Sequence, residues 1–334
     1  MIASFPIPPA PRNDAAPPSG LSGLAAWTPV ALDLTPPAPW IDWADLRGVR
    51  FAEPFFHQTV ERWAGGDPRP LVRTGLEALA ALDAAPSLDP DLFVFHMSRC
   101  GSTLVSRLAS CVPGVLAVAE PAPLNVLLMA TSEAMNEAAR VVLLRTLVRA
   151  LGRRRFGDER RYLLKLSSWN VCHIALFRRA FPGVPAVWVQ REPGAVVASL
   201  IADPPGWGSL QRDPRALHRA FGLAPDDAAG DRPAFFTAAL AAMLRAIRDD
   251  VGPTLVLDYR ALPDAVWTDV APLLGLGLGD EDIARMRDEA RFDSKTAGHR
   301  VFVARPEAHG DLAEPVRALV AQHLVPLYHA VALR

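Results

Sequence analysis

Short apolar runs alternate with helical patterns through most of this 334-residue chain, and this alternation restricts the fold more than any other feature. The runs that are typical of buried strands are 92–96, 162–165, 186–190 and 254–258. Helical spacing of apolar residues is found at 103–112, 133–151, 170–180, 194–201, 234–249, 266–274 and 280–290. Strands separated by helices form parallel sheets covered on both faces. The sequence therefore predicts an α/β fold of three layers with a central parallel sheet.

The segments before this alternation have a different character. Residues 1–39 contain ten prolines, which predicts a Pro-rich, disordered leader. Residues 40–88 hold two helical patterns, at 51–63 and 70–85, and are expected to form a small helical lead-in to an α/β domain at 89–334. A polar stretch at 203–231, rich in Pro and Gly, is expected to be a long loop, either a substrate lid or an insertion.

The composition limits the class of protein. Half of the residues are hydrophobic and the net charge is only −1, which argues against a broad nucleic-acid-binding surface. No apolar run reaches the ~18 residues that span a bilayer. The three cysteines, Cys100, Cys111 and Cys172, are too few for a disulfide framework and fit a reducing compartment. We therefore expect a cytoplasmic protein without a membrane or nucleic-acid partner.

The strongest chemical signal follows the first strand. There Arg99-Cys100-Gly101-Ser102-Thr103 leads directly into a helical pattern. A loop of small residues at a helix N-terminus directs backbone N–H groups at one point, where a phosphate-like anion is favoured, although a plain capped turn has the same pattern. The lysine of an ATP-hydrolysing P-loop is missing. A thiol at this position, beside Arg99, is also expected to have a lowered pKa and to be open to oxidation.

A second candidate site follows the strand at 186–190. Arg191 comes directly after this strand, and Ser199 lies about two turns into the helical pattern that follows. The two side chains can therefore bind one phosphate group together. Read without the first motif, the same pattern also fits an ion-paired arginine and an ordinary helical serine.

Together the two motifs resemble those of sulfotransferases that use 3′-phosphoadenosine-5′-phosphosulfate (PAPS). Arg99 to Thr103 is similar to the 5′-phosphosulfate loop of the bacterial and tyrosyl-protein branches, with Cys100 as a departure, and Arg191 and Ser199 match the 3′-phosphate signature. The resemblance implies a P-loop nucleotide-binding fold. It also implies that residues from Arg99 to Leu104 hold the phosphosulfate, while Arg191 and Ser199 hold the 3′-phosphate.

The same resemblance implies the catalytic residues. Glu120 lies where related enzymes have a general base that removes the proton of the acceptor hydroxyl. Lys165 ends the strand at 162–165 and corresponds to a lysine that stabilises the leaving oxygen, and Arg99 would stabilise the transferred group. Ser167 stands where cytosolic members carry a catalytic histidine, a departure that makes Glu120 the expected base.

Three further residues complete the expected nucleotide site. Tyr259 resembles a family tyrosine near the adenine, although Arg260 replaces the usual glutamate. Lys295 and Arg300 lie in a basic, glycine-containing segment like the loop that closes the nucleotide site in the family. Lys295 and Lys165 are the only lysines among 35 basic residues, which marks them as positions that need a compact ammonium group.

The expected activity is therefore transfer of a sulfuryl group from PAPS to the hydroxyl of a small-molecule or peptide acceptor, without a metal. Two alternatives remain: a non-catalytic nucleotide-binding module of the same fold, and, with less support, a kinase that uses ATP. A metal site built from His309, Asp311 and either His323 or His329 lacks the strand-rich pattern that such sites need.

Overall fold

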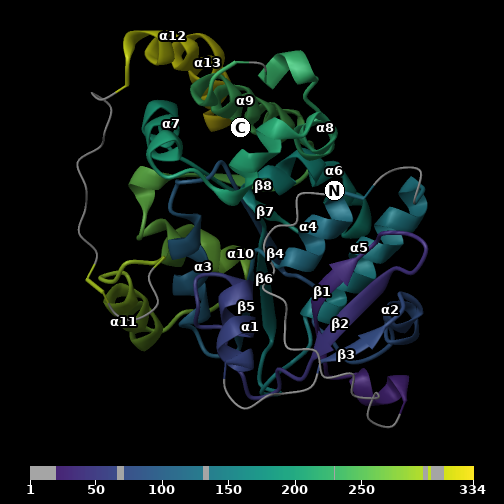
Figure 1. The fold of residues 1–334 in the computed structure, drawn as a ribbon. Coiled ribbons are helices and arrows are strands. Elements are labelled where there is room, and N and C mark those ends of the chain that lie inside the picture. The colour runs from purple at the N-terminus through teal and green to yellow at the C-terminus, as the bar shows by residue number, and fades with distance from the viewer. Residues whose placement is uncertain (1–19, 66–70, 131–134, 229, 296–299, 302–311) are drawn as a thin grey trace.

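A parallel sheet of five strands, in the order β5-β6-β4-β7-β8, forms the centre of the molecule (Figure 1). The computed structural model describes residues 20–65, 71–130, 135–228, 230–295, 300–301 and 312–334. The strands are β4 (Leu92–His96), β5 (Val115–Ala119), β6 (Arg161–Lys165), β7 (Ala186–Gln190) and β8 (Thr254–Asp258). The predicted three-layer α/β class with a central parallel sheet is confirmed.

Helices cover both faces of this sheet. In Figure 1, α3 and α11 lie on one side of the strands and α4, α5 and α6 on the other, while α9, α12 and α13 stand above them. The α-helices are α1 (Phe56–Ala64), α2 (Glu77–Ala81), α3 (Ser102–Ser110), α4 (Ala122–Leu128), α5 (Glu137–Leu151), α6 (Ile174–Ala180), α7 (Pro193–Ala202), α8 (Pro214–Phe221), α9 (Arg232–Asp249), α10 (Ala271–Leu273), α11 (Asp280–Glu289), α12 (Glu314–His323) and α13 (Val325–Ala332). The short turns are η1 (Leu21–Leu24), η2 (Ser168–His173), η3 (Gly206–Arg212), η4 (Pro225–Ala228), η5 (Tyr259–Ala261) and the π-helical η6 (Val266–Val270).

The apolar runs of the sequence become strands because both of their faces are covered. Every residue of β4 and β7 is buried, so neither strand shows the alternation of a strand with one wet face. β5 is the one strand of the central sheet that the sequence did not predict. Its five residues, Val115–Ala119, follow α3 after a short turn and continue the apolar character of that helix. The parallel strands point their carboxyl ends at one edge of the sheet, where ligands of open α/β folds bind.

The N-terminal part is a second, antiparallel sheet. β1 (Thr28–Asp33), β2 (Trp40–Ala44) and β3 (Val72–Thr74) pair in that order. The prediction of disorder through residue 39 is therefore wrong for β1, and the helical prediction for 40–88 is wrong for β2 and β3. Trp27 and Trp43 are buried in the core, and this burial outweighs the high proline content. The expected leader residues 1–19 lie outside the described residues.

The stretch 203–231 is not an open loop. It contains η3, α8 and η4, and α8 begins where the Asp213 side chain accepts hydrogen bonds from the backbone N–H groups of Arg215 and Ala216. Gly222, with a φ of 70°, ends the helix. The prediction of a loop rested on the Pro and Gly content of this stretch and overlooked these two helix caps. Within the described part of the chain, no helix is both long and apolar enough to cross a membrane.

Candidate active site

The loop between β4 and α3 has the shape that the sequence predicts for an anion site. Gly101 precedes the helix with a φ of 83°, and Ser98 and Arg99 also have positive φ values, of 72° and 51°. For a residue other than glycine this region costs roughly 1 kcal/mol or more, so surrounding contacts must hold the loop. One such contact is the hydrogen bond from the Ser98 backbone N–H to Nδ1 of His96, at 3.1 Å. The loop then presents the N-terminus of α3, with Ser102 and Thr103 in its first turn.

Gly101 also lets the loop approach the turn after β8. A Cβ atom placed on Gly101 would lie 2.6 Å from Cδ1 of Leu262 and 3.1 Å from Cδ2 of Tyr259. A larger residue would therefore need both the unfavourable φ and a shift of these side chains. The close approach places Tyr259, the expected adenine contact, directly against the loop.

Arg191 lies on the same side of the loop. Its guanidinium stands over the Tyr259 ring, 4.5 Å from the ring centre, and its Nη1 donates to the carbonyl of Arg99 at 3.4 Å. Arg191, expected to bind the 3′-phosphate, and Tyr259, expected to contact the adenine, are thus brought together at the ends of β7 and β8. Ser199 is half-buried in α7, the helix that follows Arg191.

Glu120 and Lys165 form an ion pair at the carboxyl edge of the sheet. Lys165 ends β6 and is completely buried, whereas the Glu120 side chain, just beyond β5, is 23% exposed. Burial tends to raise the pKa of Glu120, but the positive charge of Lys165 and the contact with His96 hold it well below its usual range. Glu120 is therefore a carboxylate at neutral pH.

His96 completes this group and was missed by the sequence reasoning. Because its Nδ1 accepts the Ser98 N–H, its proton is on Nε2, which lies 3.0 Å from the carbonyl of Leu166 and 3.6 Å from Oε1 of Glu120. Burial and the charge of Lys165 lower the pKa of His96, so the ring is neutral. The available signal was a single polar residue at the end of an otherwise apolar strand.

A cluster of positive charge faces this carboxylate. Partial desolvation and the positive charges of Arg99 and Lys165 lower the pKa of Lys295, whose side chain remains exposed. Lys295 and the loop arginine line the same cavity, and Lys165 is near enough for its charge to act on Lys295. Such a cluster stabilises a bound anion.

Arg99 itself is held by a residue that the sequence did not indicate. Its Nη2 donates to Oδ2 of Asp203 at 2.8 Å and also to the backbone carbonyl of Asp203, directly after α7. The Arg99 side chain is only 17% exposed, whereas that of Asp203 is 77% exposed. An anion bound at the loop would therefore compete with a solvated carboxylate for this guanidinium.

The other expected residues differ in how they relate to the site. Leu104 is half-buried in α3, and Arg300 is exposed, with its carbonyl accepting the Asp293 N–H at 2.7 Å. The assignment of Arg300 to the nucleotide phosphates stays a prediction. Residues His309 and Asp311 of the considered metal site lie outside the described residues. The described ranges contain no group of three or more His, Cys, Asp or Glu side chains arranged to hold a metal.

The expectation of a reactive Cys100 is wrong. The thiol is fully buried and donates to the carbonyl of Val189 at 3.1 Å. Burial raises the pKa of this thiol to about 11. The side chain thus points to the core beneath the loop, while its helix-terminal position alone had indicated the opposite.

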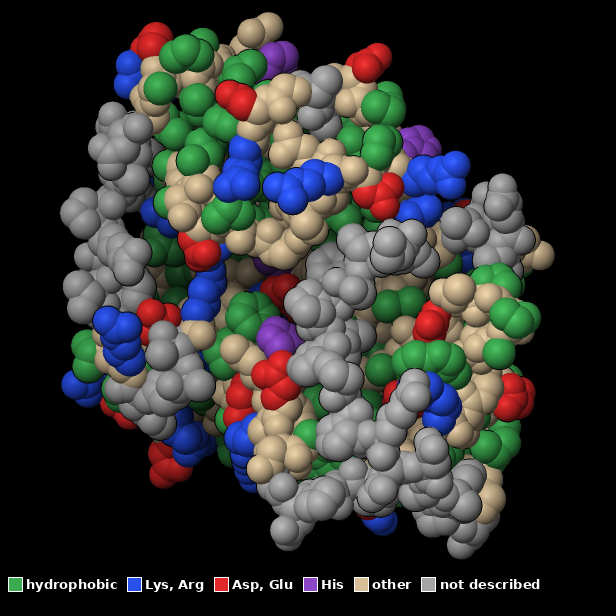
Figure 2. Space-filling view, viewed as in Figure 1, with side chains coloured by type: hydrophobic (Ala, Val, Ile, Leu, Met, Phe, Trp, Pro, Cys, Tyr) green, Lys and Arg blue, Asp and Glu red, His purple; other side chains and the backbone are tan. Residues whose placement is uncertain are grey.

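A cavity of about 760 Å³ opens at the β4–α3 loop. The loop from Ser98 to Thr103, Glu120, His96 and Lys295 form its polar end. In the space-filling view the molecule is hollowed near the centre of this face, where histidine, acidic and basic side chains adjoin (Figure 2).

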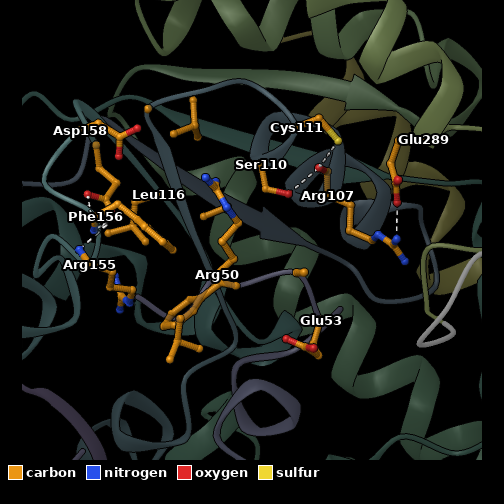
Figure 3. A pocket seen from close by; sticks show the side chains of 17 residues that line it. Arg50, Glu53, Arg107, Ser110, Cys111, Leu116, Arg155, Phe156, Asp158 and Glu289 are labelled. Atoms are coloured by element: carbon orange, nitrogen blue, oxygen red, sulfur yellow. Dashed lines mark hydrogen bonds and ion pairs between the residues drawn. The ribbon is translucent and has the colours of Figure 1, made fainter. Parts of the chain in front are cut away.

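A second cavity, of about 340 Å³, lies beside the edge strand β5 (Figure 3). Its charges are largely satisfied within the protein: Arg107 pairs with Glu289, and the Arg50 guanidinium lies 4.6 Å from the centre of the Phe156 ring. It shares no lining residue with the larger cavity. The candidate active site is therefore the cavity at the β4–α3 loop.

Comparison with solved structures finds similar folds at low sequence identity. Sulfotransferase STF9 from Mycobacterium avium is 15% identical, with a TM-score of 0.43 and coverage of 79% of this chain and 80% of that one. Sulfotransferase STF1 from Mycobacterium tuberculosis H37Rv is 14% identical, with a TM-score of 0.41 and coverage of 72% and 78%. The sulfotransferase domain of the Synechococcus PCC 7002 olefin synthase is 16% identical, with a TM-score of 0.40 and coverage of 75% and 96%.

No protein-family model and no curated protein sequence matches the chain. The three solved structures are sulfotransferases or sulfotransferase domains, the family whose motifs the sequence resembles.

Proposed function

We propose that the protein is a sulfotransferase that moves a sulfuryl group from PAPS to an acceptor hydroxyl. The observation that carries this proposal is the meeting of an anion-binding loop, Lys295 and one ionised carboxylate in a single cavity, with the buried Lys165 paired to that carboxylate. A nucleotide-binding module needs only the loop and Arg191. The buried Lys165–Glu120 pair adds the groups that a transfer reaction requires.

The residues on the β8 side fit the nucleotide. Arg191, stacked on Tyr259, would bind the 3′-phosphate together with Ser199, and Tyr259 would contact the adenine. The N-terminus of α3, with Ser102 and Thr103, would hold the 5′-phosphosulfate. Bound PAPS supplies the sulfuryl group and leaves as adenosine 3′,5′-bisphosphate.

The residues on the β5 and β6 side fit the proton and charge transfers. Glu120 accepts the proton of the acceptor hydroxyl while the new oxygen–sulfur bond forms. Its lowered pKa makes it a weak base, so the proton leaves late, when bond formation has already made the hydroxyl acidic. Lys165 stabilises the negative charge that develops on the leaving phosphate oxygen, and Arg99 stabilises the transferred group. His96 orients Glu120 through the Nε2 contact.

The test is release of adenosine 3′,5′-bisphosphate from PAPS in the presence of a mixture of hydroxyl compounds. We expect release that depends on the mixture and is lost in Glu120→Gln. A protein that binds adenosine 3′,5′-bisphosphate but releases none from PAPS under any acceptor would be the binding module instead.

A further inference from the structure

The larger cavity extends from the loop into an apolar chamber. We use this name for the part lined by Val30, Phe55, Val60, Leu71, Trp169 and Trp207. Val30 belongs to β1, Phe55 is the residue directly before α1, and Val60 lies in the middle of α1. The N-terminal sheet and α1 therefore build a wall of the same cavity that holds the candidate catalytic groups.

The chamber leads directly to the catalytic pair. Nζ of Lys165 lies 5.3 Å from the centre of the Phe55 ring. Glu120, the partner of Lys165, lines the same cavity. A compound that packs along Phe55 can thus place one terminal hydroxyl at Glu120 while the rest of it stays in the chamber.

The polar side chains between the chamber and the loop are already engaged with one another. Asn125 donates from Nδ2 to Oγ of Ser167 at 3.1 Å and accepts at Oδ1 from Nδ2 of Asn170 at 3.0 Å. Oδ1 of Asn170 accepts the backbone N–H of Ser167 at 3.0 Å. Both amide side chains are already hydrogen-bonded within the protein and are not counted as partners for a ligand. The hydroxyls of a sugar or the backbone groups of a peptide are costly to bury without hydrogen-bond partners.

None of the six residues that define the chamber is charged, so a charged acceptor body would find no ion-pair partner among them. His57 and Glu61 are exposed on α1, whereas Glu120, Arg99, Asp203 and Lys295 belong to the anion-binding end. The chamber walls between these two ends are apolar and aromatic. Burial there favours apolar area, and aromatic rings add specific contacts.

We propose that the acceptor is an uncharged, largely apolar compound that carries its reacting hydroxyl at one end and is bound in the apolar chamber. This inference rests on the proposed function for the fate of the hydroxyl, but the binding that it describes can be measured without turnover. The cavity volume of about 760 Å³ is in the range of pockets that enclose a drug-sized molecule.

The experiment is calorimetric titration of the full chain with 2-naphthol, with and without adenosine 3′,5′-bisphosphate, and with glucose and the peptide Gly-Tyr-Gly as comparison probes. We expect 2-naphthol to bind and the two polar probes not to bind. A transfer assay with PAPS and the same three compounds is expected to give product from 2-naphthol only. Binding or transfer that prefers glucose or the peptide overturns the inference.

Val60→Glu places a carboxylate in the chamber and is expected to weaken 2-naphthol binding about tenfold or more. Val142→Glu, the same change at a side chain that is 62% exposed on α5, is the matched control and should leave binding unchanged. Ala64→Glu, at the end of α1 and also on the lining, serves as a second variant if Val60→Glu does not fold. Equal 2-naphthol affinity in a folded chamber variant and in Val142→Glu overturns the inference.

Titration with adenosine 3′,5′-bisphosphate tests the proposed function separately from the apolar acceptor class. Wild-type protein that binds this nucleotide but not 2-naphthol contradicts the acceptor class and leaves the proposed function standing. Protein that binds 2-naphthol but not the nucleotide contradicts the proposed function and supports the chamber as an apolar binding site.

Discussion

The ammonium group of Lys165 and the carboxylate of Glu120 form an ion pair across the carboxyl ends of the neighbouring strands β6 and β5. A backbone hydrogen bond of 2.7 Å, from the Glu120 N–H to the Lys165 carbonyl, supports the same approach. Glu120 has a φ of 53°, so the chain turns sharply at the strand end and directs its carboxylate back over β6. The pair gives a fully buried lysine a carboxylate partner, without which its burial would be costly.

Replacement of Glu120 by glutamine is expected to remove turnover and keep nucleotide affinity. Loss of a general base reduces the rate by about 10²–10⁴-fold. Steady-state release of adenosine 3′,5′-bisphosphate measures the first effect, and calorimetry with this nucleotide measures the second. A wild-type rate in Glu120→Gln would refute the assignment of the base.

The same substitution should lower the free energy of unfolding by about 1–3 kcal/mol at pH 7, because Lys165 loses its partner in a site that is only partly open to water. The double variant Glu120→Gln/Lys165→Met is expected to recover part of this loss, since it removes the unpaired buried charge. Urea unfolding of the wild type and the variants gives the three values. A double variant less stable than Glu120→Gln would show that Lys165 is not destabilised by losing the carboxylate.

The stability gained from the pair should decrease as the pH falls. The pKa of Glu120 is lowered in the folded protein, whereas in the unfolded chain it is near the ordinary value of about 4.3. The contribution is therefore complete above this ordinary value and is lost as the pH falls from there towards the folded value. Urea unfolding at pH 7 and at about pH 3 should show a smaller difference between wild type and Glu120→Gln at the lower pH. A difference that is constant or grows would contradict the ion-pair account.

Arg191→Ala is expected to weaken binding of adenosine 3′,5′-bisphosphate about 10- to 100-fold, the effect of one charge-assisted hydrogen-bonding group. Binding of adenosine 5′-monophosphate, which lacks the 3′-phosphate, should change little. Arg260→Ala is the control, because Arg260 is also basic and directly follows Tyr259 but pairs with Asp258 at an exposed position. Equal losses for both nucleotides would show that Arg191 shapes the loop and does not bind the 3′-phosphate.

Gly101→Ala is expected to abolish measurable nucleotide binding, because the added carbon meets Leu262 and Tyr259 as well as an unfavourable φ of 83°. Gly48→Ala isolates the backbone effect, since Gly48 has a φ of 73° and no atom within 4 Å of the added carbon. The control should lose only about 1 kcal/mol of stability and keep full nucleotide affinity. Full affinity in Gly101→Ala would mean that the loop does not need its close approach to Tyr259.

The sequence predicted the parts of the site that depend on local pattern. β4, the loop and α3 are contiguous, so an apolar run followed by small residues and a helical spacing predicted the loop correctly. Arg191 at the end of β7 was accessible in the same way. β1 and β2 were not, because their stability depends on burial of Trp27 and Trp43 in the core, which the high proline content of residues 1–39 did not indicate.

The contacts among Glu120, Lys165 and His96 could not be derived from local pattern. They depend on the strand order β5-β6-β4, which brings the ends of three separate strands to one place. Lys295 and Asp203 reach the loop from segments distant in sequence, and only the tertiary structure joins them to Arg99. For Cys100, the position at a helix N-terminus was predicted correctly. The expected reactive thiol was wrong because the side chain is buried.

The most direct test of the central claim is calorimetric titration of the full chain with adenosine 3′,5′-bisphosphate, adenosine 5′-monophosphate and ATP. The account predicts tight binding of the bisphosphate, clearly weaker binding of the monophosphate and no preference for ATP. Absence of bisphosphate binding, or a preference for ATP, would contradict the assignment of the β4–α3 loop and Arg191 to PAPS.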